Sequence, residues 1–123
     1  MKPTLLIVDD IVSIREKLRD SLSSEFEVVG LAASGAEAIE ICKQTHPQLV
    51  LMDLVMPLMS GIDATRAIVA ALSPAPRIVV LSALHDENIV IRALEAGAAE
   101  FLVKPVSERK IRDALKHLAS EAA

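Results

Sequence analysis

The sequence is short of cysteine and of aromatic residues, and each shortage excludes a class of protein. Cys42 is the only cysteine in 123 residues, so an intramolecular disulfide is impossible, and its place in a helical pattern predicts a small apolar side chain near the core. Tryptophan and tyrosine are absent, and only two phenylalanines occur. The chain therefore has no Trp or Tyr ring to stack on a flavin, which argues against a flavin carrier.

Basic clusters and long apolar runs are also absent. The 17 acidic residues outnumber the 13 lysines and arginines, for a net charge of -4, so we expect no direct binding to nucleic acid or to a membrane surface. No apolar stretch approaches the roughly 20 residues that cross a bilayer, and the N-terminus does not resemble a signal peptide. We expect a cytoplasmic protein. The scattered histidines His46, His85 and His117 lack ligand spacing and are predicted to be solvated.

What the sequence does have is a series of five short apolar runs. Four are nearly continuous, a pattern typical of parallel strands covered by helices on both faces. The second run is short and lies between Glu27 and Gly30, which predicts an edge strand. The runs cover residues 5–8, 28–29, 49–52, 78–81 and 101–103.

A helical pattern follows each run. Ser60 with Asp63 predicts the start of the third helix, Gly97 the end of the fourth and Ser107 the start of the fifth, while the second should end before His46. Five strand–helix pairs predict one doubly wound α/β domain over residues 1–123. The expected apolar stripes are Ile14, Leu18 and Leu22; Ala36, Ile39 and Cys42; Ile89, Ala93 and Leu94; and Ile111, Leu115 and Leu118.

Polar residues that can act as ligands or catalytic groups follow the predicted strands. Asp9 and Asp10 come after the first, Asp53 ends the third, Ser82 follows the fourth and Lys104 follows the fifth. In open α/β sheets, working groups lie beyond the carboxyl ends of the strands. We therefore expect three carboxylates and one ammonium to meet at one end of the sheet, provided that these strands are neighbours.

Clustered carboxylates repel one another, and one of them must take up a proton unless a cation compensates the charge. Mg²⁺, a hard ion that prefers oxygen ligands, is the natural candidate. Such a site suits phosphoryl transfer, with Asp53 as the nucleophile that forms an aspartyl-phosphate. The metal and Lys104 would neutralise the phosphoryl oxygens, and the Ser82 hydroxyl would donate a hydrogen bond to them.

At these residues the sequence resembles the receiver domains of two-component response regulators, the CheY-like family. The resemblance spans the chain and implies a flavodoxin-like (βα)5 fold, a parallel sheet of order 2-1-3-4-5 with helices on both faces. The matching residues are Asp9-Asp10, residues 51–57 around Asp53, Gly61, Ser82-Ala83, Gly97-Ala98 and Lys104-Pro105.

The resemblance also implies roles. Asp53 would accept a phosphoryl group from a phosphohistidine of a sensor histidine kinase or histidine phosphotransfer protein, or from a small acyl-phosphate. Asp10, Asp53 and the carbonyl of Val55 would bind Mg²⁺ directly, and Asp9 would bind it through water. The phosphoryl oxygens would be held by Ser82, Lys104 and the Ala83 amide.

Phe101 takes the family's switch-aromatic position, and simple core packing explains it equally well. If it is a switch, Ser82 moves toward the phosphate and Phe101 turns inward, which remodels a surface for a target protein or a phosphorylation-dependent dimer. Val55 and Leu84 should border the path of an attacking water without hydrogen-bonding it. We therefore expect slow dephosphorylation.

Other functions fit less well. A phosphatase of the haloacid-dehalogenase class needs a second aspartate two residues after its nucleophile, and that position is Val55. A flavodoxin needs a first loop that cradles phosphate, whereas Asp9 and Asp10 would repel one. We therefore expect no enzyme beyond self-phosphorylation and self-dephosphorylation. A receiver cut from a longer regulator, with a DNA-binding or methylesterase effector, remains the alternative.

Overall fold

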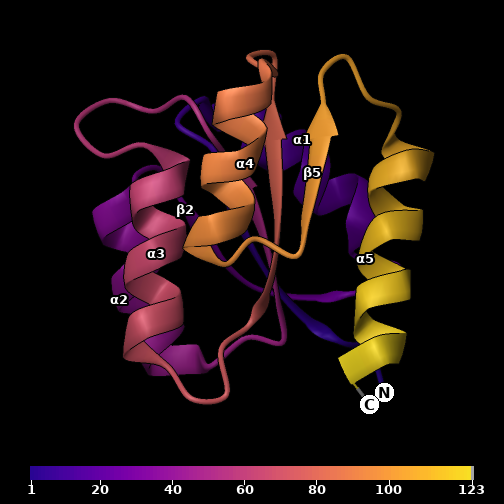
Figure 1. Ribbon diagram of the computed structural model, residues 1–123. Coiled ribbons are helices and arrows are strands. Elements are labelled where there is room, and N and C mark those ends of the chain that lie inside the picture. Colours follow the sequence, from indigo (N-terminus) through magenta and orange to yellow (C-terminus); the bar gives the residue numbers. More distant parts are fainter. Residues whose placement is uncertain (123) are drawn as a thin grey trace.

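The computed structural model describes residues 1–122 as a five-stranded parallel sheet between two layers of helices (Figure 1). The strands are ordered β2-β1-β3-β4-β5, so the predicted fold is confirmed. Their bounds are β1 Thr4–Val8, β2 Glu27–Ala32, β3 Leu49–Asp53, β4 Arg77–Ser82 and β5 Glu100–Val103. The helices are α1 Val12–Leu22, α2 Gly35–Thr45, α3 Gly61–Ala71, α4 Glu87–Ala96 and α5 Glu108–Ala122.

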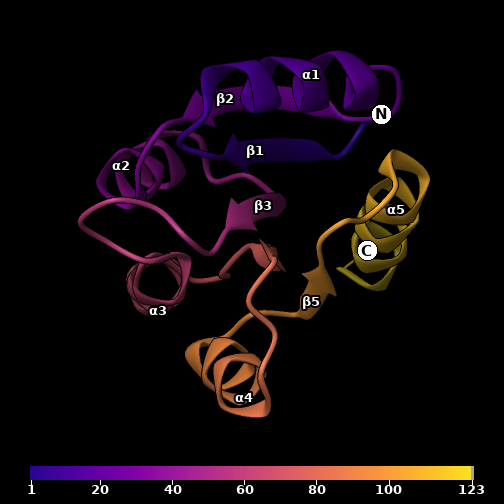
Figure 2. The same ribbon diagram turned by 90° about the horizontal axis from the view of Figure 1, so that it is seen from above.

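Each face of the sheet carries its own apolar core. Helices α1 and α5 cover one face, and α2, α3 and α4 cover the other (Figure 2). Strand β3 is buried along its whole length, which explains its unbroken apolar sequence. Strand β2 lies at the edge, as predicted, and its central residues are only half-buried. It is longer than the two valines suggested, because residues 30–32 continue the pairing with β1.

The predicted helix ends are confirmed by their caps. Ser60 Oγ accepts a hydrogen bond of 3.2 Å from the Asp63 amide, and Ser107 Oγ accepts one of 3.1 Å from the Lys110 amide. Gly97 ends α4 with φ of 116°, a left-handed conformation that favours glycine. Helix α2 ends at Thr45, immediately before His46.

Two residues that were predicted to be buried are exposed. Ala36 is exposed because the buried stripe of α2 runs through Gly35, Ala38 and Cys42. Leu94 is 47% exposed, since the short α4 meets the core through Ala93 and Ala96. Both errors are choices of helix phase, which a short amphipathic pattern leaves open.

The remaining stripes and isolated residues follow the prediction. Leu18 and Leu22 of α1 are buried, as are Ile111, Leu115 and Leu118 of α5. Cys42 is fully buried, and burial raises the pKa of its thiol to about 11. All three histidines are exposed. Within residues 1–122, no helix is both long and apolar enough to cross a membrane.

Candidate functional site

The carboxyl ends of four strands bring the predicted residues to one edge of the sheet. Asp53 is the last residue of β3 and is in register with Leu81 of β4, so Ser82 lies one step beyond it. Asp9 directly follows β1, the other neighbour of β3, and Lys104 directly follows β5. The sheet order therefore makes β1, β3, β4 and β5 neighbours, which is the condition for the predicted convergence of these residues.

The three aspartates form a compact acidic cluster. One carboxylate oxygen from each of Asp9, Asp10 and Asp53 lies within 4.8 Å of the others. Asp9 and Asp53 are 2% and 7% exposed, while Asp10 faces solvent. A divalent ion bound to oxygen ligands fits this set, since several carboxylates meet around one point and one side stays open for water.

Two hydrogen bonds hold the loop that presents Asp9 and Asp10. The amide of Ile11 donates to Asp9 Oδ1 over 2.9 Å, and Arg15 Nη1 donates to the Asp9 carbonyl over 2.7 Å. Arg15 thus ties the first turn of α1 to the end of β1. Sequence reasoning missed Arg15, because an arginine in a helical pattern gives no signal of the carbonyl that it meets.

Lys104 supplies the compensating charge. Its Nζ lies 3.1 Å from Asp53 Oδ1 in a hydrogen-bonded ion pair. The pKa of Asp53 is nevertheless raised above its ordinary value, chiefly by burial, with Asp9 and Asp10 adding to the rise and Lys104 opposing it. Burial and the neighbouring carboxylates therefore disfavour the ionised form of Asp53 in the metal-free protein. An ionised Asp53 lowers the stability of the folded state.

Replacing Asp53 with asparagine is expected to raise the free energy of unfolding of the metal-free protein at neutral pH. A carboxyl whose folded-state pKa is raised binds more protons in the folded than in the unfolded state, so its destabilising effect grows as pH rises through that pKa and vanishes on acidification. Urea unfolding in chelator at several pH values measures the difference. An Asp53→Asn gain that persists unchanged at pH below the ordinary aspartate value of 3.8 would contradict this origin.

The hydroxyl of Ser82 is hydrogen-bonded within the loop that follows β4. Ser82 is 1% exposed, and its Oγ accepts a hydrogen bond of 2.9 Å from the Leu84 amide. Because the hydroxyl acts here as an acceptor, its own hydrogen remains free to be donated. The adjacent Ala83 is exposed at the same strand end. The backbone of the next strand joins here too, as the Lys104 amide donates to the Ser82 carbonyl over 2.9 Å.

Gly61 packs against the backbone of Asp53. Its amide donates to the Leu54 carbonyl over 2.7 Å. A Cβ at Gly61 would overlap the carbonyl oxygen of Asp53 and lie 2.8 Å from the Leu54 Cα. The first residue of α3 therefore packs directly against the end of β3. Sequence reasoning noted this glycine only as a match to the family, because its steric reason depends on the tertiary approach.

Two exposed apolar residues lie on the loops that follow β3 and β4. Val55 and Leu84 are 54% and 50% exposed, on the loops that follow β3 and β4. Phe101 is half-buried and packs against the core beneath α2, α3 and α4. Its rotation during switching stays a prediction.

Comparison with known proteins identifies the class. The family model for the response regulator receiver domain matches residues 5–116, so the chain belongs to the response regulator receiver family. The chemotaxis protein CheY of Thermotoga maritima is 39% identical over 120 residues, which cover 97% of this chain and 99% of that protein. The chain is thus homologous to CheY and to other two-component response regulators.

Two further relatives bear on ligands and on domain context. A CheX–CheY–BeF3–Mg²⁺ complex from Borrelia burgdorferi contains a similar chain, with a TM-score of 0.84, 32% identity and coverage of 98% and 89% of the two chains. A protein-glutamate methylesterase/protein-glutamine glutaminase of Methanococcus maripaludis is 44% identical over 108 residues, which cover 85% of this chain and 29% of that protein.

Proposed function

We propose that this chain is a phosphorylation switch whose acceptor is Asp53 and whose phosphorylation requires Mg²⁺. The observation that carries the proposal is the position of the Asp53 carboxylate, which is nearly buried, clusters with two other aspartates and is paired with the Lys104 ammonium at 3.1 Å. A lone structural aspartate needs none of these neighbours. Together they are what in-line phosphoryl transfer onto a carboxylate requires.

The metal would be held by Asp10, Asp53 and the Val55 carbonyl, with Asp9 reaching it through water. The fit is supported by the three converging carboxylates and by the raised pKa of Asp53, which falls once a cation compensates the cluster. Bound Mg²⁺ supplies charge neutralisation at the transferring phosphoryl oxygens. The exposed position of Asp10 leaves room for retained waters.

The chain's own residues then perform the transfer. Asp53 Oδ attacks phosphorus, the bond from phosphorus to the donor atom breaks, and the leaving group departs with that electron pair. Lys104, already beside Asp53, balances negative charge on a phosphoryl oxygen. Ser82 and the Ala83 amide contribute two further donors. The donor is a phosphohistidine on a sensor histidine kinase or phosphotransfer protein, or a small acyl-phosphate.

The output of the switch is a changed protein surface. In the proposed switch, the Ser82 hydroxyl moves from its hydrogen bond with the Leu84 amide toward the phosphoryl group, and Phe101 turns inward from its half-buried position on β5. The remodelled surface would bind a downstream target or effector, or a second phosphorylated copy. We place this activity in the cytoplasm, without nucleic-acid or membrane contact and without turnover of any other substrate.

Residues 1–123 would form one receiver domain in this proposal. The methylesterase relative, of which the match covers only 29%, keeps open the alternative that such a domain is joined to an effector. Either arrangement uses the same acceptor site.

The acceptor is tested by intact mass. After incubation with acetyl phosphate and Mg²⁺, the wild-type chain should gain the mass of one phosphoryl group, and Asp53→Asn should gain none. Omitting Mg²⁺ should prevent the gain in wild type. The neighbouring variant Asp63→Asn, at an exposed position of α3, serves as the matched control and should be phosphorylated normally. A wild-type chain that never gains the mass would contradict the proposal.

The exposed apolar residues Val55 and Leu84 predict a long-lived phosphorylated form. Val55 and Leu84 crowd the approach to the phosphoryl group and cannot orient a water molecule. The double variant Val55→Asn/Leu84→Glu should therefore lose its phosphate faster by on the order of tenfold, a modest share of what general acid–base assistance supplies. Release of labelled phosphate measures the decay. The same chemical change on the exposed face of α4, Ile91→Asn/Leu94→Glu, should leave it unchanged; equal decay of both double variants would refute the idea.

A further inference from the structure

Arg15, on the first turn of α1, holds the peptide group that joins two of the three clustered aspartates. Its Nη1 donates to the carbonyl oxygen of Asp9 over 2.7 Å, and this carbonyl belongs to the peptide group between Asp9 and Asp10. Because a peptide group is planar, fixing its carbonyl also fixes the direction of the backbone on both sides. One guanidinium hydrogen bond therefore helps to set the directions in which the side chains of Asp9 and Asp10 leave the chain.

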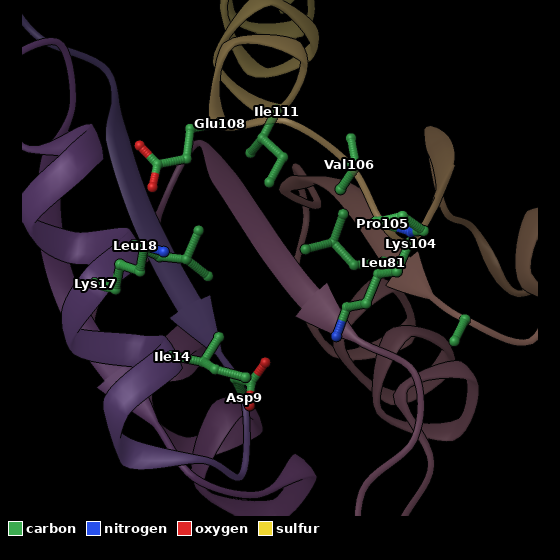
Figure 3. Close-up of a pocket in the computed structure, with 11 residues that line it drawn as sticks. Asp9, Ile14, Lys17, Leu18, Leu81, Lys104, Pro105, Val106, Glu108 and Ile111 are labelled. Atoms are coloured by element: carbon green, nitrogen blue, oxygen red, sulfur yellow. The ribbon is translucent and has the colours of Figure 1, made fainter.

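Few other contacts restrain this peptide group. The Ile11 amide holds one oxygen of the Asp9 carboxylate, but within residues 1–122 no hydrogen bond holds the Asp10 carboxylate, and no second donor reaches the Asp9 carbonyl. Packing is incomplete on one side of the loop, where a cavity of about 520 Å³ borders Asp9 (Figure 3). The placement of Asp10 therefore depends strongly on Arg15.

The guanidinium of Arg15 bonds to a carbonyl, whereas the ammonium of Lys104 is paired with the Asp53 carboxylate. Arg15 is half-buried and forms no ion pair in the described part of the chain. Its positive charge alone would repel a metal ion at the cluster, so any support that it gives to the metal must come from its hydrogen bond. Charge and position therefore predict opposite effects when Arg15 is removed.

We infer that Arg15 is a positioning residue for the divalent cation, because it holds the Asp9–Asp10 peptide group so that both carboxylates face one point. The inference rests on the proposed function, since it takes the cluster of Asp9, Asp10 and Asp53 as the Mg²⁺ site. One carboxylate oxygen of each lies within 4.8 Å of the others, and rotation of the peptide group would change that spacing. Residues that orient metal ligands contribute roughly ten- to a hundredfold to metal affinity.

Titration of the isotope-labelled, unphosphorylated protein with Mg²⁺, followed by amide chemical shifts, tests the inference without a phosphoryl donor. Arg15→Met keeps an apolar stem but loses the charge and the donors, and should bind Mg²⁺ about tenfold more weakly than wild type. Arg15→Lys keeps the charge and a donor for the carbonyl, and should bind Mg²⁺ more tightly than Arg15→Met. Charge alone predicts the reverse order. The amide spectra also show whether each variant is folded.

Arg19→Met is the matched control for the lost charge. Arg19 lies one turn further along α1, where it pairs with Asp20 at 3.2 Å, and its side chain makes no hydrogen bond to the acidic loop. This variant should bind Mg²⁺ at least as tightly as wild type. An Arg15→Met protein that binds Mg²⁺ as tightly as wild type, or more tightly than Arg15→Lys, would overturn the inference.

The Mg²⁺ dependence of phosphorylation by acetyl phosphate separates positioning from a general distortion of the site. Arg15→Met should need about tenfold more Mg²⁺ for half its maximal rate, yet reach the wild-type rate at saturating Mg²⁺, because Arg15 does not touch the transferring group. A loss confined to the maximal rate would contradict the positioning role. If wild type bound Mg²⁺ and Arg15→Met bound it equally well, only the role of Arg15 would fall; if wild type bound none, the proposed function itself would fail.

Discussion

Replacing Lys104 with methionine should slow phosphorylation of Asp53 by about a hundredfold, the typical loss when one preorganised donor is removed from a site of developing charge. The lysine Nζ lies 3.1 Å from Asp53 Oδ1, so a phosphoryl group on that carboxylate would be within its reach. Methionine keeps the length and apolar stem of the side chain but offers no charge and no hydrogen-bond donor. The rate of mass gain with acetyl phosphate at saturating Mg²⁺ measures the effect.

The same substitution should tighten Mg²⁺ binding. Lys104 and the metal are both cations that compete for the negative field of three clustered carboxylates. Removing the ammonium relieves a repulsion that amounts to ~1 kcal/mol across a partly hydrated site, so the affinity should rise by severalfold. A rise in Mg²⁺ affinity together with a slower phosphorylation would show that Lys104 balances charge. If Lys104 only supported the fold, its loss would distort the site and lower both the Mg²⁺ affinity and the phosphorylation rate.

Lys110→Met is the matched control for both measurements. Lys110 is exposed on the first turn of α5, and only its backbone amide takes part in the cap formed by Ser107. The Lys110→Met protein should bind Mg²⁺ with the wild-type affinity and accept the phosphoryl group at the wild-type rate. If Lys104→Met accepted phosphate as fast as this control, Lys104 would have no part in the transfer.

Much of the architecture follows from sequence because it rests on local rules. A continuous apolar strand such as 49–52 is typical of a sheet buried on both faces, and Ser107 or Gly97 mark helix ends through hydrogen bonds within a few residues. The convergence of Asp9, Asp53 and Lys104 also follows, because parallel strands all present their carboxyl ends at one edge.

What sequence reasoning missed depends on approaches between segments far apart in the chain. The contact between Gly61 and the Asp53 carbonyl is set by how closely α3 approaches the end of β3. Apolar periodicity does not encode that distance. Leu94 shows the same limit. The face of α4 that carries the small residues Ala93 and Ala96 packs against the core, and Leu94 is left exposed on another face.

Gly61→Ala is the substitution expected to cost the most stability. The new methyl group would overlap the Asp53 carbonyl and press on the Leu54 backbone, and backbone cannot rotate away as a side chain can. We expect a loss of about 3 kcal/mol in the free energy of unfolding, at the upper end for overpacking. Urea unfolding in chelator measures this loss.

Because the displaced backbone carries the side chain of Asp53, the proposed acceptor, the folded fraction of Gly61→Ala should also bind Mg²⁺ more weakly and gain phosphate more slowly than wild type. Gly30→Ala is the matched control, since its methyl group would meet only the side chains of Ile41 and Leu6, at 3.0 and 3.3 Å. These can shift by a few tenths of an ångström, so that variant should lose less than about 1 kcal/mol and keep wild-type phosphorylation. Equal losses in the two variants would show that Gly61 supports the fold in general and does not position Asp53.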